Sequence, residues 1–151
     1  MKIVVQRVSR ASCTVDGTVT GSIDRGFMLL VGFGRSDTRE IARKQAEKIS
    51  KLRIFSDENG KINKNIYDVG GSILSISQFT LYGDTRKSNR PSFIEALSGP
   101  EAVSLYEYFN ECLRELGLRV ETGIFGADMK IDPRLCSGID FIKPIYISIS
   151  G

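Results

Sequence analysis

The stretch most suggestive of chemistry is SQFTL, which places hydroxyl and amide side chains inside a segment that alternates like a β-strand. Alternation predicts Ser77 and Phe79 on one face of that strand, and Gln78 and Thr80 on the other. A half-exposed strand with polar side chains in water explains the pattern equally, since strands favour threonine. A reactive or binding site is the alternative, and the neighbouring segments favour it.

A basic loop follows SQFTL directly and carries the cations Arg86, Lys87 and Arg90. Glycines also flank the motif, so its backbone groups are expected to be accessible. Basic side chains beside hydroxyls suit a phosphate or the end of a nucleic acid.

A second cluster is TGIFGADM, residues 122–129. Gly123 and Gly126 permit tight turns or the close approach of a ligand to the backbone. Phe125 and Met129 have the side chains needed to sandwich a base. A hairpin turn with two core anchors explains the same residues. Arg7 is a further candidate: a charge in an apolar strand is either solvated or holds a neighbouring loop.

The sequence contains no histidine, which restricts the chemistry most. A Ser-His-Asp or Cys-His nucleophile is excluded in this chain and in any homo-oligomer of it. The three cysteines are widely spaced with no CxxC, which argues against a disulfide framework or a zinc site. We therefore expect neither metal nor cofactor, and a reducing cytoplasmic setting.

The bulk properties indicate one soluble domain of 151 residues, with 41% hydrophobic residues and a net charge of +3. The longest apolar run, FMLLV, is too short to span a membrane, and the N-terminus shows no signal peptide. Hydrophobic periodicity predicts two helices, one after a capping box at 37–40 and one from 98–101 to Gly117. The predicted strands cover residues 2–8, 12–15, 18–23, 27–33, 52–55, 72–81, 118–122 and 145–150.

These elements predict a compact, β-rich α+β fold. Its mostly antiparallel sheets would form a barrel-like core, with the two helices packed on the outside. The strand at 27–33 is expected to be central because it is apolar throughout.

Four segments together resemble the D-aminoacyl-tRNA deacylase family: QRV, LLVGFG, SISQFTLYGDTRKSNRPSF and ETGIFGADM, in order over roughly residues 1–130. The resemblance implies a homodimer that hydrolyses the ester between a D-amino acid, or glycine, and the 3′-terminal adenosine of tRNA. Aminoacyl-tRNA would be its partner, with no DNA and no membrane.

The resemblance also implies roles for the candidate residues. Ser77, Gln78, Phe79 and Thr80 would line the aminoacyl pocket, with the Phe79 amide facing the substrate. Arg7 would hold a pocket-forming loop. The substrate-binding residues near the adenosine would be Gly123, Phe125, Gly126, Ala127 and Met129, and the cations in contact with the tRNA backbone would be Arg86, Lys87 and Arg90.

The segment 131–151 departs from the family pattern. The family inserts a glycine–cis-proline pair, within NDGPVT, into the partner's pocket to exclude L-amino acids; here Gly138 is followed by Ile139. Two explanations of this departure are open: a divergent tail, and a reading frame that is altered after residue 130. Chiral selectivity is therefore in question, and the alternatives are a catalytically weak dimer that binds tRNA ends and a hydrolase of small non-RNA esters.

Overall fold

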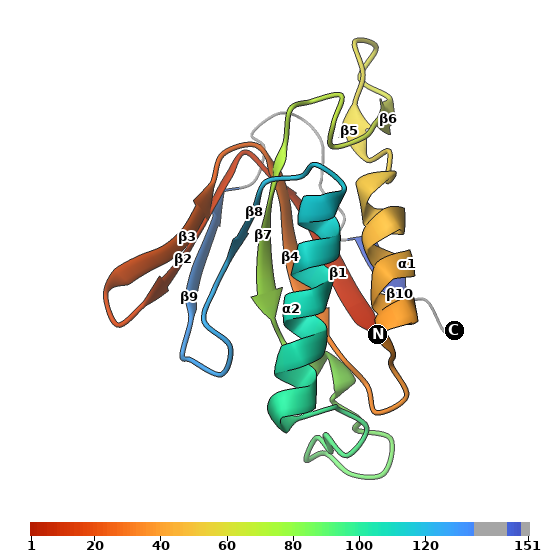
Figure 1. Ribbon diagram of the computed structural model, residues 1–151, viewed down its shortest axis with the longest axis vertical. Coiled ribbons are helices and arrows are strands. Elements are labelled where there is room, and N and C mark those ends of the chain that lie inside the picture. The colour runs from red at the N-terminus through yellow and green to blue at the C-terminus, as the bar shows by residue number, and fades with distance from the viewer. Residues whose placement is uncertain (135–144, 149–151) are drawn as a thin grey trace.

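The computed structural model describes residues 1–134 and 145–148, which form three layers (Figure 1). A five-stranded sheet of order β10-β1-β4-β7-β8 lies between the two helices and a three-stranded sheet of order β3-β2-β9. The two remaining strands, β5 and β6, pair with each other. The helices are Arg39–Ser50 (α1), Gly99–Glu115 (α2) and a short 3₁₀ helix, Phe79–Tyr82 (η1). The strands are Lys2–Val8 (β1), Arg10–Val15 (β2), Thr18–Ile23 (β3), Gly26–Gly32 (β4), Phe55–Ser56 (β5), Ile62–Lys64 (β6), Ser72–Ser77 (β7), Val120–Thr122 (β8), Lys130–Arg134 (β9) and Ile145–Ser148 (β10).

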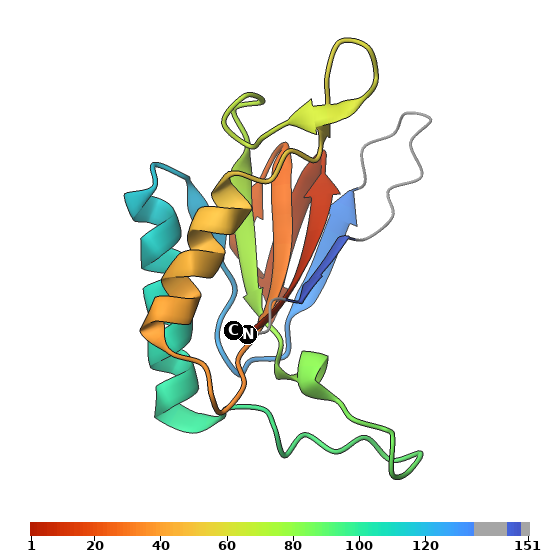
Figure 2. The ribbon, with the colours of Figure 1, turned by 90° about the vertical axis from the view of Figure 1, so that its right-hand side faces the viewer.

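The middle strand β4 is buried on both faces, as its continuous apolar sequence predicts. Phe27, Leu29 and Val31 pack in the core beneath the helices, whereas Met28 packs toward the three-stranded sheet. Figure 2 shows both helices on the same side of the central sheet. Because parallel neighbours need a crossover, the chain passes through α1 between β4 and β7, and through α2 between β7 and β8.

The α+β class is confirmed, but the barrel-like core is wrong. Among the strands that the structure describes, five pairings are antiparallel and two are parallel. Strands β10 and β8 form the two edges of the central sheet, so this sheet does not close on itself. Alternation in a sequence predicts which side chains share a face, but it contains no information on whether the edge strands meet.

The helix starts differ from the predicted capping boxes. Thr38, not Asp37, caps α1, and its hydroxyl accepts a hydrogen bond from the Ile41 N–H at 3.3 Å. Ser98 does occupy the cap position of α2, but its side chain accepts no hydrogen bond there. Gly117 lies just beyond the end of α2 with φ of +83°, as expected for a residue that ends a helix.

The ends of the chain are paired with each other. Strand β10 lies antiparallel to β1 at the edge of the central sheet, which confirms the last predicted strand for residues 145–148. Gly138, Ile139 and Pro144 lie outside the described residues. Pro133 is described, in β9, and its peptide bond is trans. No helix in the described part of the chain is long and apolar enough to cross a membrane.

Candidate functional site

The SQFTL segment is not a strand throughout. Strand β7 ends at Ser77, the Gln78 N–H still donates to the Val31 carbonyl at 2.7 Å, and the 3₁₀ helix η1 then begins at Phe79. The predicted strand to residue 81 is therefore wrong, and so are the faces predicted for Phe79 and Thr80. Strand-favouring residue types continue through this segment without glycine or proline, so local sequence does not indicate the turn.

Two long-range contacts hold η1 in place. Lys2 donates from its Nζ to the Leu81 carbonyl at 3.1 Å, and the Tyr82 hydroxyl donates to Asp37 Oδ2 at 3.2 Å. Asp37 also accepts a hydrogen bond from the Gly34 N–H at 2.6 Å and forms an ion pair with the Met1 amino group. Burial and the neighbouring Asp37 carboxylate both raise the pKa of Tyr82, so the phenol keeps its proton.

A cavity of about 200 Å³ lies where the two sequence motifs meet. Its wall contains Ser77, Gln78 and Phe79 from the first motif. The other residues that line it are Val31, Gly32, Phe33, Leu97, Ala102, Phe125, Gly126, Ala127 and Met129. The structure therefore brings together most of the residues that the sequence analysis proposed for a substrate pocket.

Two glycines shape the turn between β8 and β9. Gly126 has φ of +77°, which L-residues with a side chain rarely adopt. Gly123 does not line the cavity. A Cβ at this position would lie 2.4 Å from the Met129 sulfur and 3.1 Å from the Cys13 sulfur, so glycine lets Met129 pack close to the backbone.

The lining of the cavity carries no ionisable side chain within the residues described by the structure. Its polar groups are the Ser77 hydroxyl, the Gln78 amide and backbone groups. The N–H groups of Phe79 and Thr80 donate no hydrogen bond to any described residue. The first N–H groups of a helix have no partner within it. They are suited to support a negatively charged oxygen, and general acid–base chemistry by a side chain has no candidate here.

Thr80 lies outside the cavity lining. Its side chain is exposed, and its hydroxyl is hydrogen-bonded to the Gln78 amide nitrogen. Arg7 is also outside the lining. It is buried on β1 opposite Phe27, four residues along β4 from Val31, which corresponds to about 13 Å. Its role as a loop tether stays a prediction.

The basic loop also lies outside the cavity lining. Arg86 donates from its guanidinium to both carboxylate oxygens of Asp84, at 2.7–3.1 Å. The hydrogen bonds from Arg86 are the main reason why the pKa of Asp84 lies below its ordinary value. Lys87 and Arg90 are exposed, and within the described residues their side chains form no ion pair. Two of the three predicted phosphate-binding cations are therefore unpaired.

Sequence reasoning missed the apolar part of the cavity wall: Val31, Gly32, Phe33, Leu97 and Ala102. These residues fall in runs or stripes of apolar sequence that also describe ordinary core. It also missed the structural role of Asp37, which was read as a helix cap.

Comparison with known proteins identifies the family. The model described as D-Tyr-tRNA(Tyr) deacylase matches residues 4–134. The D-aminoacyl-tRNA deacylases of Geobacillus sp. (strain WCH70) and Deinococcus deserti are 57% and 54% identical to this chain over 132 residues. These alignments cover 87% of the chain, and 87% and 90% of the respective relatives. A solved structure described as c-Myc DNA Unwinding Element Binding Protein is 37% identical, with a TM-score of 0.89 and coverage of 100% of both chains.

The match to the family model covers both motifs that form the cavity and stops at residue 134. The segment that lacks the glycine–proline pair begins at residue 131, so most of it lies beyond the match. The cavity, its two motifs and these relatives agree: the chain belongs to the D-Tyr-tRNA(Tyr) deacylase family, the family of the D-aminoacyl-tRNA deacylases.

Proposed function

We propose that the protein hydrolyses the ester between a D-amino acid, or glycine, and the 3′-terminal adenosine of tRNA. The observation that carries the proposal is the cavity between the two motifs. Among the described residues, the Phe79 N–H at its wall donates no hydrogen bond, and no ionisable side chain lines it. Such a cavity suits a substrate that is already activated, and an aminoacyl ester is one.

The aminoacyl group lies against Ser77, Gln78 and Phe79 in this proposal, and the adenosine lies near Phe125 and Met129. A water molecule attacks the ester carbonyl carbon, and the negative charge that develops on the carbonyl oxygen is stabilised by the Phe79 N–H. The bond to the ribose 3′-oxygen then breaks, and that oxygen takes up a proton. Positioning and amide donors together lower the barrier by several kcal/mol.

The neighbouring ribose 2′-hydroxyl supplies the group that helps to activate water, because no side-chain base is found among the described residues that line the cavity. RNA is therefore required as the carrier of the amino acid. The exposed cations Lys87 and Arg90 contact tRNA phosphates. The protein acts as a cytoplasmic homodimer, without metal or cofactor.

Single-turnover deacylation of D-tyrosyl-tRNA tests this function. We expect the wild-type protein to hydrolyse this ester, and a matched tRNA that ends in 2′-deoxyadenosine to be inert. Full activity on the deoxy substrate contradicts the role of the 2′-hydroxyl. Binding of D-tyrosyl-tRNA without turnover would support the alternative, a dimer that binds tRNA ends. Activity on free aminoacyl esters of small alcohols would support the remaining alternative, a hydrolase of small non-RNA esters.

The same assay with L-tyrosyl-tRNA addresses the replaced tail. Because the segment 131–151 contains no glycine–proline pair, we expect D- and L-tyrosyl-tRNA to be hydrolysed at comparable rates. A strong preference for the D form would show that another element excludes L-amino acids.

A further inference from the structure

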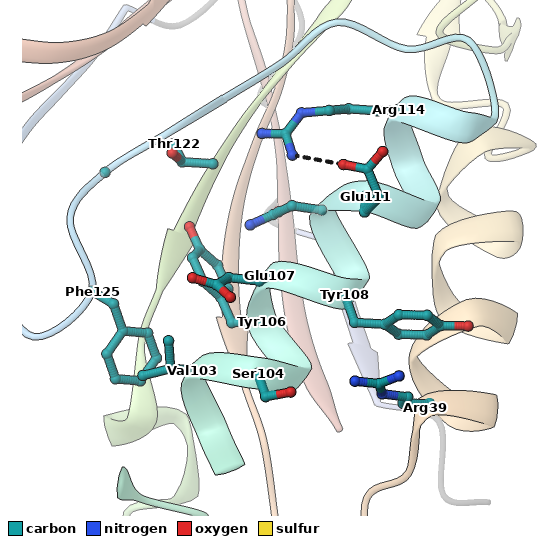
Figure 3. A pocket seen from close by; sticks show the side chains of 12 residues that line it. Arg39, Val103, Ser104, Tyr106, Glu107, Tyr108, Glu111, Arg114, Thr122 and Phe125 are labelled. Atoms are coloured by element: carbon teal, nitrogen blue, oxygen red, sulfur yellow. Dashed lines mark hydrogen bonds and ion pairs between the residues drawn. The ribbon is translucent and has the colours of Figure 1, made fainter. Parts of the chain in front are cut away.

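A second concave region crosses α2 on the outside of the molecule, and we call it the α2 groove (Figure 3). Its volume is about 470 Å³. Figure 3 shows Thr122 and Phe125 on one side of α2, and Arg39 with Tyr108 on the other. The Phe125 ring belongs to both the groove and the cavity, so the two sites are adjacent. The lining residues used below are Arg39, Glu107, Tyr108, Asn110, Glu111 and Arg114.

One cation of the groove is unpaired. The Arg39 guanidinium lies 5.0 Å from the centroid of the Tyr108 ring and forms no hydrogen bond or ion pair with any described residue. The other two cations that reach this region are paired: Arg43 with Glu115 at 3.2 Å, and Arg114 with Glu111 at 3.4 Å. Stacking on an aromatic ring leaves the N–H edge of Arg39 available to an anion.

The position of Arg39 in its helix does not account for its charge. Arg39 is the first residue of α1. A cation in the first turn opposes the helix dipole, which favours negative charge at that end. The arginine is therefore not explained by helix stability, and among the described residues its guanidinium stacks on the groove residue Tyr108.

Two acceptors in the groove also lack partners among the described residues. Glu107 is exposed, and its carboxylate forms no ion pair. Asn110 is only 2% exposed, and its Oδ1 accepts no hydrogen bond. A buried acceptor without a partner costs free energy. Less than 1 Å² of this oxygen is accessible, so the exposed Glu107 carboxylate is the acceptor that a ligand in the groove reaches.

This combination points to a ligand that has an anionic end and an N–H donor end. A free phosphate does not fit, because the Glu107 and Glu111 carboxylates repel it and the acceptors stay unsatisfied. A nucleotide fits both requirements: its phosphate pairs with Arg39, and the exocyclic amine of its base donates to Glu107, as carboxylates accept from base amines elsewhere.

We propose that the α2 groove binds the nucleotide that immediately precedes the terminal adenosine of the RNA substrate. The proposal rests on the function proposed above, which places that adenosine in the cavity. Consecutive nucleotides of a single strand are neighbours, and the two sites share the Phe125 ring. The groove thus extends recognition along the RNA beyond the reacting ester.

Two substrates separate the groove from the cavity: D-tyrosyl-tRNA, and D-tyrosyl-adenosine, which has no preceding nucleotide. The variants are Arg39→Gln and Glu107→Ala, both on exposed helix positions where folding is preserved. We expect each to raise KM for D-tyrosyl-tRNA by about fivefold, the size of one exposed charge contact, with kcat unchanged. Hydrolysis of D-tyrosyl-adenosine should not change.

Lys48→Gln is the matched control, because it removes one charge from an exposed position near the other end of α1. We expect it to leave both substrates unchanged. The proposal is overturned if Arg39→Gln and Glu107→Ala leave KM for D-tyrosyl-tRNA unaltered, if both substrates are affected equally, or if Lys48→Gln has the same effect as Arg39→Gln.

A binding titration separates this proposal from the proposed function. The probes are the dinucleotide cytidylyl-adenosine and free adenosine. We expect wild-type protein to bind the dinucleotide more tightly, and the difference to vanish in Arg39→Gln. Equal affinities in the wild type overturn the groove even if hydrolysis is observed. If neither ester is hydrolysed, the proposed function fails, while this titration still decides whether the groove binds a nucleotide.

Discussion

The cavity and the α2 groove are adjacent, but their linings differ in kind. Within the described residues, the cavity is walled by apolar side chains, two polar uncharged ones and backbone groups. The groove carries arginines, glutamates and tyrosines. In the part of the chain that the structure describes, Arg39 and Glu107 of this groove form no ion pair. Phe125 lines both regions.

The difference separates chemistry from recognition. A site without its own acid or base depends on the reactivity of its substrate, and the protein contributes shape and fixed amide donors. A site with unpaired charges and acceptors contributes selection of the ligand. Variants of the cavity should therefore alter the rate on every substrate, whereas variants of the groove should alter only substrates long enough to reach it.

The largest effect is expected for Phe79→Pro, which removes the N–H that we propose stabilises the developing charge. Proline is tolerated at the first position of a helix, and Gln78, the residue before it, has a non-helical backbone (φ −147°, ψ 87°). We expect kcat to fall by about 10²–10³-fold on both D-tyrosyl-tRNA and D-tyrosyl-adenosine.

Phe79→Ala is the control, since it keeps the N–H and loses the ring that packs edge-on against Phe93 at 5.3 Å. Its rate should fall by about tenfold or less. Equal losses in the alanine and proline variants would assign the effect to the ring and not to the amide.

Tyr106→Phe tests the packing between the two regions. The buried Tyr106 hydroxyl donates to the Ser75 carbonyl at 2.8 Å, and the ring lies 5.8 Å from that of Phe125. Loss of the hydroxyl should lower the free energy of unfolding by about 1–2 kcal/mol, measured by urea denaturation. Tyr108→Phe loses only an exposed hydrogen bond from Arg43 and should change the free energy of unfolding by about 0.5 kcal/mol or less. Similar losses in both variants would contradict this difference.

Alkaline pH should weaken the contact that holds η1 beside the cavity. The folded-state pKa of Tyr82 lies above the ordinary value of 10.0, chiefly through burial. The stabilisation that the protonated Tyr82 hydroxyl gives to the folded state is therefore complete below pH 10.0. It is lost as the pH rises further, because the unfolded chain releases the proton first. Urea denaturation at increasing pH should show a smaller loss of stability above pH 10 in Tyr82→Phe than in the wild type. An equal loss of stability in Tyr82→Phe and in the wild type would exclude Tyr82 as the source of the alkaline destabilisation.

The smallest effect is expected for Thr80→Ala. Thr80 is exposed, lies outside the cavity lining, and its hydroxyl is engaged by Gln78. Because no ionisable side chain lines the neighbouring cavity among the described residues, we expect single-turnover deacylation to change by about threefold or less. Complete loss of activity would make Thr80 the nucleophile and would overturn the contrast between a passive cavity and a charged groove.

The sequence predicted elements better than their arrangement. The apolar run of β4, the strand at residues 18–23 and Gly117 at the end of α2 are confirmed, because each depends on local patterning. The turn after Ser77 was not predictable, because it depends on contacts from Lys2 and Asp37, which are distant in sequence. The open central sheet is a property of how strands pair across the whole chain, which alternation does not describe.

The same difference between local patterns and distant contacts explains why only part of the candidate site was predictable from the sequence. SQFTL and GIFGADM carry recognisable residue types, and the fold brings Phe79 and Phe125 to one cavity. Ala102 reaches it from a helix stripe that looks like any buried face. The groove was not anticipated, because Arg39, Glu107 and Asn110 come from two helices and have no motif that connects them.

The charge-free lining of the cavity has a consequence for inhibition. Reagents that trap an activated serine, cysteine or histidine have no target among its described residues. A blocking compound has to compete by shape, with an acceptor oxygen placed against the Phe79 N–H and an aromatic ring beside Phe125. Extending such a compound across the Phe125 ring into the α2 groove would add charge complementarity, so a two-part molecule is the natural starting point.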